Sequence, residues 1–109
     1  MCGIIGGNNP DWNYNEAISA ISHRGPNGQK IERIKDIFLG FARLAIIDLS
    51  EDAMQPMISE DGKYAIIFNG EIYDYKKIRS GLKKKGYHFR TESDTEVLLY
   101  AFIEWKEKA

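Results

Sequence analysis

The amino-acid sequence predicts a single domain of the α+β class. Segments with apolar residues at helical spacing alternate with short continuous apolar runs, which are typical of strands. The chain has 109 residues, enough for one domain at most, and it contains no internal repeat or low-complexity tract. Its 43% hydrophobic and 28% charged residues are the proportions of an ordinary soluble globular protein.

Charge and cysteine content exclude several classes of protein. A formal net charge of −1 argues against a dedicated nucleic-acid or anionic-membrane binder. No apolar run approaches the roughly 18 residues of a membrane span, and the sequence begins without a signal-peptide pattern. The single cysteine excludes an internal disulfide framework and fits a reducing compartment, so we expect a cytoplasmic protein. With one cysteine and two histidines, no structural zinc site is expected.

The first third of the chain predicts a strand, a helix and a turn. Residues 3–7 form an apolar run closed by glycines, typical of a buried strand whose backbone is closely approached at both ends. A helical stripe follows, and it ends at a dense turn signal over residues 23–28. The residues of this stripe are Tyr14, Ala17, Ile18 and Ile21.

The middle of the chain predicts strands and loops. Residues 37–47 are apolar on both faces, which indicates a buried strand pair or one long bent strand, with Gly40 as a possible bulge. Residues 48–57 are polar and predict a loop. Asp61-Gly62 is typical of a hairpin turn leading into a strand over residues 64–68.

Two helices are predicted toward the end of the chain. The first has an apolar stripe opposite many lysines, which we interpret as a solvated face rather than a polyanion site, and Gly86 ends it. Ser93 and Glu96 form a capping box that opens the second. The apolar stripe of the first is Tyr75, Ile78 and Leu82, and the buried face expected for the second is Val97, Leu98, Ala101, Phe102 and Trp105.

Cys2, directly behind Met1, is the strongest candidate for chemistry. Removal of Met1 would leave a thiol and a free α-amine on one residue. A thiol has a reference pKa of about 8.5 and an α-amine one of about 7.7–8.0, so the amine can take the thiol's proton without a histidine. A lone cysteine is more often a small buried hydrophobe. A strand over residues 3–7 would nevertheless hold this terminal residue still, as a catalytic residue requires.

Six motifs in order resemble the N-terminal glutaminase domain of glutamine-dependent asparagine synthetases, class II amidotransferases of the N-terminal-nucleophile hydrolase type. Each motif is weak alone, but the ordered set is specific and runs essentially from end to end. The motifs are Met1-Cys2-Gly3-Ile4-Ile5-Gly6, His23-Arg24-Gly25-Pro26, Arg43-Leu44-Ala45-Ile46-Ile47-Asp48, Gln55-Pro56-Met57, Phe68-Asn69-Gly70-Glu71-Ile72-Tyr73 and Ser93-Asp94-Thr95-Glu96-Val97.

The resemblance implies a four-layer αββα sandwich with antiparallel sheets, present here only in part. Domains of this kind are considerably longer, so residues 1–109 are expected to be the N-terminal portion of one, with a synthetase domain outside this chain. Strands that lack their neighbours expose edges and apolar faces. We therefore expect the isolated chain to form a homo-oligomer.

The resemblance also implies a reaction. Cys2 would attack the side-chain amide of L-glutamine, form a glutamyl thioester, release ammonia and be freed by water. The Asn69 side-chain amide and the Gly70 backbone N–H would stabilise the oxyanion. Asn and Gly suit this role because they permit the φ angles that aim an N–H inward. A plain hairpin turn at Asn69-Gly70 is the alternative interpretation.

Glutamine recognition is assigned by the same resemblance. Arg43 would bind the α-carboxylate in a bidentate fork, and Glu71 and Asp94 would hold the α-ammonium and its surroundings. The alternatives are a surface ion pair for Arg43 and a helix N-terminal role for Asp94. His23 is expected to be structural. The pocket wall would be the backbone of Leu44, Ala45, Ile46 and Ile47.

The function implied is that of the glutaminase half of an asparagine synthetase. Ammonia would pass to an ATP-dependent synthetase domain that amidates aspartate. No cofactor is expected here, and ATP and Mg²⁺ belong to the synthetase domain. A chain that retains Met1 has no free amine on Cys2 and is expected to be inactive. The alternatives are a non-catalytic, self-associating or structural module and an amidotransferase that serves a different acceptor. No nucleic-acid or membrane partner is expected.

Overall fold

The computed structural model describes residues 2–44 and 53–106. These residues form a mixed helix and strand fold, as the sequence predicts. The elements in chain order are β1 (Gly3–Gly7), α1 (Tyr14–Ala20), the short 3₁₀ helix η1 (Ser22–Arg24), β2 (Gln29–Ile34), β3 (Ile37–Ala42), β4 (Met57–Ile58), β5 (Ala65–Ile66), α2 (Tyr75–Lys84) and α3 (Asp94–Trp105).

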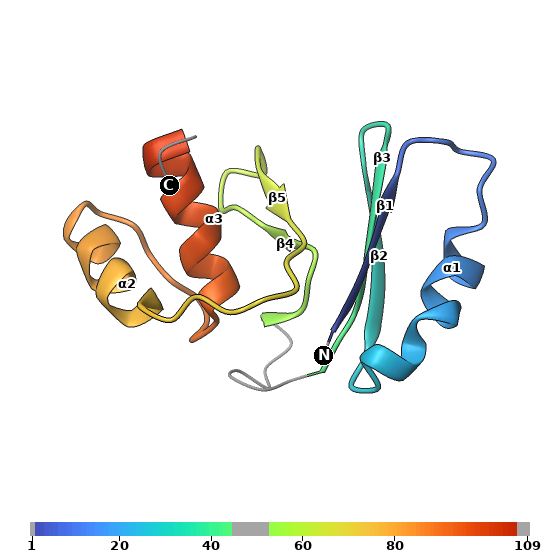
Figure 1. The fold of residues 1–109 in the computed structure, drawn as a ribbon. Helices are drawn as coiled ribbons and strands as arrows, with labels where there is room; N and C mark the ends of the chain where they lie inside the picture. Colours follow the sequence, from blue (N-terminus) through green and yellow to red (C-terminus); the bar gives the residue numbers. More distant parts are fainter. Residues whose placement is uncertain (1, 45–52, 107–109) are drawn as a thin grey trace.

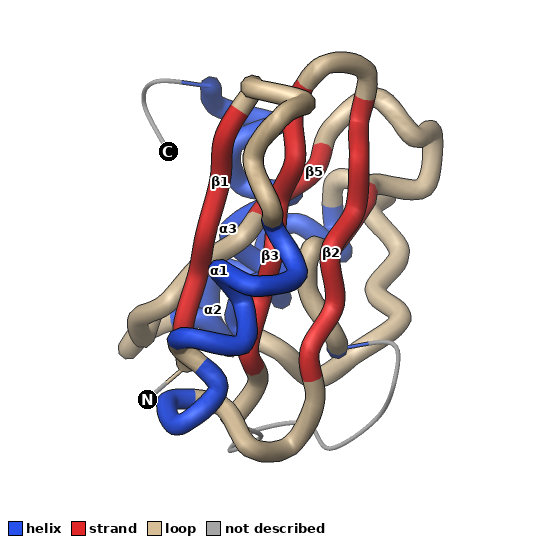
Figure 2. Tube along the Cα trace, turned by 90° about the vertical axis from the view of Figure 1, so that its right-hand side faces the viewer, coloured by secondary structure: helices blue, strands red, loops and turns tan. Residues whose placement is uncertain are grey.

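The elements lie in the order helix, sheet, sheet, helix. The three-stranded sheet β1-β3-β2 has α1 on one side, and β4, β5, α2 and α3 lie on the other side (Figures 1 and 2). The second sheet consists of the short antiparallel pair β4–β5. This is the αββα layer order expected from the resemblance, with a small second sheet. Within the described residues, no helix is both long and apolar enough to cross a membrane.

The first sheet corrects the expectation for residues 37–44, while residues 45–47 lie outside the described ranges. β3 is one central strand that ends at Ala42 and pairs antiparallel with β1 and with β2, which the sequence did not predict. Gly40 is not a bulge, because it pairs in regular register with Ile5 and Ile31. A Cβ at Gly40 would lie 2.6 Å from Cγ1 of Ile5, so the glycine permits close packing across the strands.

The prediction of close approach at both ends of β1 is confirmed. A Cβ at Gly3 would lie 2.8 Å from the Ile21 side chain, and one at Gly7 would lie 2.7 Å from the Tyr14 hydroxyl. The strand is not buried throughout, however, because it lies at a sheet edge and Ile4 is 43% exposed. Helix α1 therefore packs against β1 through glycines at its two ends.

The second half of the chain has a core between α2 and α3. Leu82 from α2 packs with Val97, Tyr100 and Ala101 from α3, and Tyr75 and Ile78 cover the cluster as predicted. Gly86 follows the last turn of α2 with φ +102°, a left-handed conformation that glycine adopts readily. The Asp61-Gly62 hairpin turn is also confirmed, with Gly62 at φ +75°.

The buried face predicted for α3 is wrong in part. Val97 and Ala101 are buried, but Leu99 and Tyr100 are buried as well, while Phe102 is 44% and Trp105 37% exposed. The helix is apolar around much of its circumference, so its sequence pattern does not select one side. Packing selects it, because Tyr100 contacts the rings of Tyr87 and Phe89.

Candidate functional site

The side chain of Cys2 lies against the backbone at the end of β3. Its Sγ accepts a hydrogen bond from the Leu44 N–H at 3.2 Å and donates one to the Leu44 carbonyl at 3.4 Å. Arg24 donates from Nε to the Cys2 carbonyl at 3.2 Å. The first strand thus carries the thiol to two residues predicted for the site, Leu44 and its neighbour Arg43.

The backbone of Arg43 is held by the turn that follows η1. Its N–H donates to the Gly28 carbonyl at 2.7 Å, and its carbonyl accepts from the Asn27 N–H at 2.8 Å. Gly25 packs even closer, because a Cβ there would lie 2.0 Å from the Ala42 carbonyl group. Arg43 is only 6% exposed, so it is buried rather than at the surface.

A second group of predicted residues lies around the segment that follows β5. Gln55 donates from Nε2 to the Phe68 carbonyl at 3.2 Å and accepts from the Phe68 N–H at 2.5 Å through Oε1. Four residues later, the Ile72 N–H donates to Asp94 Oδ2 at 3.0 Å. The three residues between these contacts, Asn69 to Glu71, include the two expected oxyanion donors and are here called the oxyanion turn. Its neighbours on both sides are fixed by side chains from elsewhere.

The reason for a glycine at position 70 differs from the one expected. Gly70 is not among the residues with a positive φ, so a left-handed backbone does not explain it. A Cβ at this position would lie 2.9 Å from Cζ of Phe68. Glycine therefore provides room for the neighbouring ring, while Asn69 is half-buried and Gly70 and Glu71 are exposed.

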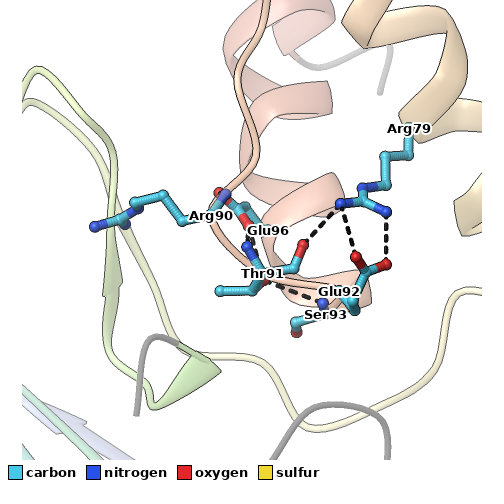
Figure 3. A network of polar contacts seen from close by, with 6 residues as sticks. All are labelled: Arg79, Arg90, Thr91, Glu92, Ser93 and Glu96. Carbon is cyan, nitrogen blue, oxygen red and sulfur yellow. Dashed lines mark hydrogen bonds and ion pairs between the residues drawn. The ribbon is translucent and has the colours of Figure 1, made fainter. Parts of the chain in front are cut away.

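The start of α3 is built by a polar network that positions Asp94. Ser93 caps the helix by accepting from the Thr95 N–H at 3.1 Å. Glu96 does not close the predicted capping box. Its buried carboxylate instead accepts from the N–H of Arg90 at 2.9 Å, and from the N–H and hydroxyl of Thr91 at 2.8 and 2.7 Å (Figure 3). The Ser93 N–H donates to the Thr91 hydroxyl.

Helix α2 braces the same loop from the other side. Arg79 forms an ion pair with Glu92, with Nη1 and Oε2 2.7 Å apart, and its Nη2 donates to the Thr91 carbonyl at 3.0 Å (Figure 3). The loop before α3 is therefore tied to both helices. Asp94, the first residue of α3, therefore follows a loop that is held in place by these contacts.

The predicted residues fall into two groups. Cys2, Arg43 and Leu44 come together at the end of β3, and Asp94 joins the residue directly after the oxyanion turn. Among the described residues, no hydrogen bond joins Cys2 to the oxyanion turn or to Asp94. Three predicted pocket residues lie outside the described ranges, namely Ala45, Ile46 and Ile47.

The supporting residues were not found in the sequence. Arg24, Gln55 and Thr95 each appeared as part of a motif without a role of its own. Within residues 2–44 and 53–106, no group of three or more His, Cys, Asp and Glu side chains could hold a metal ion.

Comparison with known proteins gives a consistent result over the whole chain. The family described as "Glutamine amidotransferase domain" matches residues 1–109. "Asparagine synthetase [glutamine-hydrolyzing] 1" of Bacillus subtilis (strain 168) is 49% identical over 89 residues, which are 82% of this chain and 14% of that protein. "Asparagine synthetase [glutamine-hydrolyzing] 3" of the same organism is 34% identical over 121 residues, 98% of this chain and 19% of the relative.

A third relative comes from another organism. "Probable asparagine synthetase [glutamine-hydrolyzing]" of Dictyostelium discoideum is 41% identical over 85 residues, covering 77% of this chain and 15% of that protein. The chain thus spans between 14% and 19% of the length of these three relatives.

Proposed function

Because the chain belongs to the glutamine amidotransferase domain family, we propose that it hydrolyses L-glutamine to glutamate and ammonia with Cys2 as the nucleophile. The observation that carries this proposal is the contact of the Cys2 thiol with Leu44, directly beside the buried Arg43. A nucleophile and a cation that suits a carboxylate thus lie at the end of one strand.

The α-amine of Cys2, exposed by removal of Met1, acts as the base. It takes the thiol proton, and the sulfur attacks the amide carbon of the glutamine side chain. The tetrahedral intermediate collapses to a glutamyl thioester, and the protonated amine returns its proton to the departing ammonia. Water then attacks the thioester, and glutamate and the free thiol are released.

The oxyanion turn stabilises the charge that develops on the amide oxygen. The Asn69 side chain and the Gly70 N–H are the proposed donors, as the resemblance implies. Preorganised donors are effective because they need no rearrangement during the reaction. The contacts of Phe68 with Gln55 and of Ile72 with Asp94 support this role, because they fix the chain on both sides of the turn.

Recognition of the free amino acid uses two charges. Arg43 binds the α-carboxylate, and Asp94 with Glu71 binds the α-ammonium. The Ile72 N–H uses one oxygen of Asp94, and a carboxylate can accept further hydrogen bonds. Leu44 to Ile47 provide the wall of the pocket. This set distinguishes glutamine from an amide within a peptide, which lacks both charges.

The ammonia is proposed to serve an ATP-dependent amidation of aspartate. The relatives are named glutamine-hydrolysing asparagine synthetases, and this chain corresponds to a small part of their length. We propose residues 1–109 as the N-terminal portion of the glutaminase domain, working with a synthetase domain that uses ATP and Mg²⁺. Glutamine hydrolysis itself needs neither ATP nor Mg²⁺ in this mechanism.

The test compares forms of the natural polypeptide that contains these residues. Intact mass identifies preparations with and without Met1, and glutamate release measures hydrolysis. The form lacking Met1 should hydrolyse glutamine, and the form retaining it should not. Turnover by protein whose mass includes Met1 would exclude the α-amine as the base.

The Cys2→Ser variant, also lacking Met1, tests the nucleophile. Hydrolysis should fall by orders of magnitude, because a hydroxyl is a far weaker acid and nucleophile than a thiol, while glutamine should still bind. Added ammonia should still support product formation by the synthetase. A near-normal glutaminase rate in Cys2→Ser would place the nucleophile elsewhere.

A further inference from the structure

We propose that Gln55 and Thr95 are positioning residues that hold the oxyanion turn in its reactive geometry. The inference rests on the proposed function, because it gives these side chains a role in glutamine hydrolysis. Neither residue needs to touch substrate. Both act through the backbone of Phe68, which directly precedes Asn69.

The Gln55 amide uses both its donor and its acceptor groups on this part of the fold. It is 5% exposed, accepts from the Phe68 N–H, and donates to the Phe68 carbonyl at 3.2 Å and to the Thr95 hydroxyl at 3.0 Å. Pairing with both backbone groups of one residue reproduces what a neighbouring strand would supply. β5 itself ends at Ile66, so at Phe68 a side chain takes the place of a strand.

The first turn of α3 anchors both ends of the oxyanion turn. The buried Thr95 hydroxyl holds Gln55, and Gln55 holds Phe68 before the turn. Asp94, one residue earlier in the helix, holds Ile72 after the turn at 3.0 Å. The Asn69–Glu71 segment therefore lies between two residues, Phe68 and Ile72, that are both held by the first turn of α3.

Loss of this anchor should affect the reaction more than glutamine binding. Oxyanion donors act on charge that appears only in the transition state. A displacement of about 1 Å at such a site can cost on the order of 10²-fold in rate. We therefore expect kcat to fall by about 10- to 100-fold in variants that lose the Gln55 contacts, with little change in KM.

The experiment uses a matched pair at Thr95 in the natural polypeptide lacking Met1. Thr95→Val removes the hydroxyl at nearly constant volume, and Thr95→Ser keeps it. Gln55→Met is a second variant of similar size without hydrogen-bonding groups. Ser59→Ala is the control, because Ser59 is also buried and, among the described residues, its hydroxyl bonds only to Asp61 and Tyr64 of its own hairpin.

The readouts are kcat, KM and hydrogen exchange of the Phe68 amide. Thr95→Val and Gln55→Met should lower kcat and speed this exchange, whereas Thr95→Ser should recover most of the rate and Ser59→Ala should leave both unchanged. In a double variant with Asn69→Ala, the effects on kcat should be less than additive, because both changes act on the same turn.

Two failures are distinguishable. If Asn69→Ala leaves kcat unchanged, the proposed oxyanion donor is wrong, and the positioning inference is overturned with it. If Asn69→Ala lowers kcat but Thr95→Val behaves like Ser59→Ala, only the positioning inference is overturned. The Thr95 pair decides the outcome even if Gln55→Met does not fold.

Discussion

Arg43 joins a buried cationic side chain to a backbone that is fixed by neighbours. The Gly28 carbonyl and the Asn27 N–H hold its main chain, and the next residue carries both hydrogen bonds to the Cys2 thiol. This position beside the thiol is the one that the proposed contact with the glutamine carboxylate requires.

This arrangement predicts a separation of binding from chemistry at two residues. Arg43→Ala should raise KM for glutamine by roughly 30- to 150-fold, the equivalent of a charge-assisted contact of about 2–3 kcal/mol. Asn69→Ala should instead lower kcat by about 10²- to 10³-fold, as expected for one oxyanion donor. Steady-state kinetics of glutamate release measures both. The reverse pattern would show that the two roles have been exchanged.

At the scale of elements, the contact between the turn after η1 and the end of β3 leaves no space for a side chain. Gly25→Ala would place a Cβ about 2.0 Å from the Ala42 carbonyl group, so one backbone segment must move. We expect a loss of about 3 kcal/mol or more in the free energy of unfolding, measured by urea denaturation.

Helix α2 supplies the control for Gly25→Ala. Gly81 lies within this helix, and a Cβ there would have no heavy atom within 4 Å. Gly81→Ala should therefore stabilise the protein by roughly 0.5–1 kcal/mol, because alanine has the higher helix propensity. Equal effects of the two substitutions would contradict the close contact at Gly25.

The β4–β5 hairpin predicts a pH dependence of stability. The Lys63 N–H and then the Ser59 hydroxyl, as hydrogen-bond donors, lower the pKa of Asp61 below its ordinary value of 3.8. Because the pKa is lowered in the folded state, the ionised Asp61 stabilises the fold above pH 3.8. This stabilisation is lost as the pH falls through the folded pKa.

The measurement compares urea midpoints of the unaltered protein and Asp61→Asn. The difference between the two proteins should be largest near neutral pH and should shrink as the pH falls below about 3.8. Other carboxylates titrate in both proteins and so largely cancel. A difference that does not change with pH would contradict the hydrogen-bonded turn as its source.

At the scale of the whole molecule, the first sheet exposes apolar side chains to solvent. Ile4 and Ile37 project from the face opposite α1 and are 43% and 51% exposed. Within the described residues, β1 and β2 each have one side without a paired strand. Exposed edges and apolar surface favour pairing with another chain.

We therefore expect the isolated 109-residue chain to self-associate into a dimer or higher oligomer. Sedimentation measures this directly, and Ile37→Lys should reduce the association because a charge on this face opposes burial. A monodisperse monomer that unfolds cooperatively would show that the chain is self-sufficient and that its edges are adequately protected.

Sequence reasoning succeeded where one local pattern decides the structure. The glycine-bounded β1, the stripe of α2 and the Asp61-Gly62 turn were all predictable because their neighbours in sequence are also their determinants. It missed β2, where charged residues such as Lys30, Glu32 and Arg33 interrupt the apolar pattern of a strand at the sheet edge. The face of α3 could not be chosen, since its partners come from other elements.

In the candidate site, too, features marked by a local pattern were predictable and those that depend on distant contacts were not. Cys2, the proposed nucleophile, stands out from its position in the chain, and the motif order identifies the family. Gln55 could not be assigned a role, because a side chain that pairs with a backbone 13 residues away leaves no periodic signal. The role of Glu96 was similarly hidden, because its partners Arg90 and Thr91 lie before the helix rather than at its cap.

The anchoring of the oxyanion turn by α3 has a consequence for biosynthesis. Cys2 is made before the turn, whereas Asp94 and Thr95 are made only after the turn that they fix. A nascent chain can therefore form β1 and expose its thiol while the turn still lacks its support. The support of the oxyanion turn should consequently form only when the first turn of α3 has left the exit tunnel and docked.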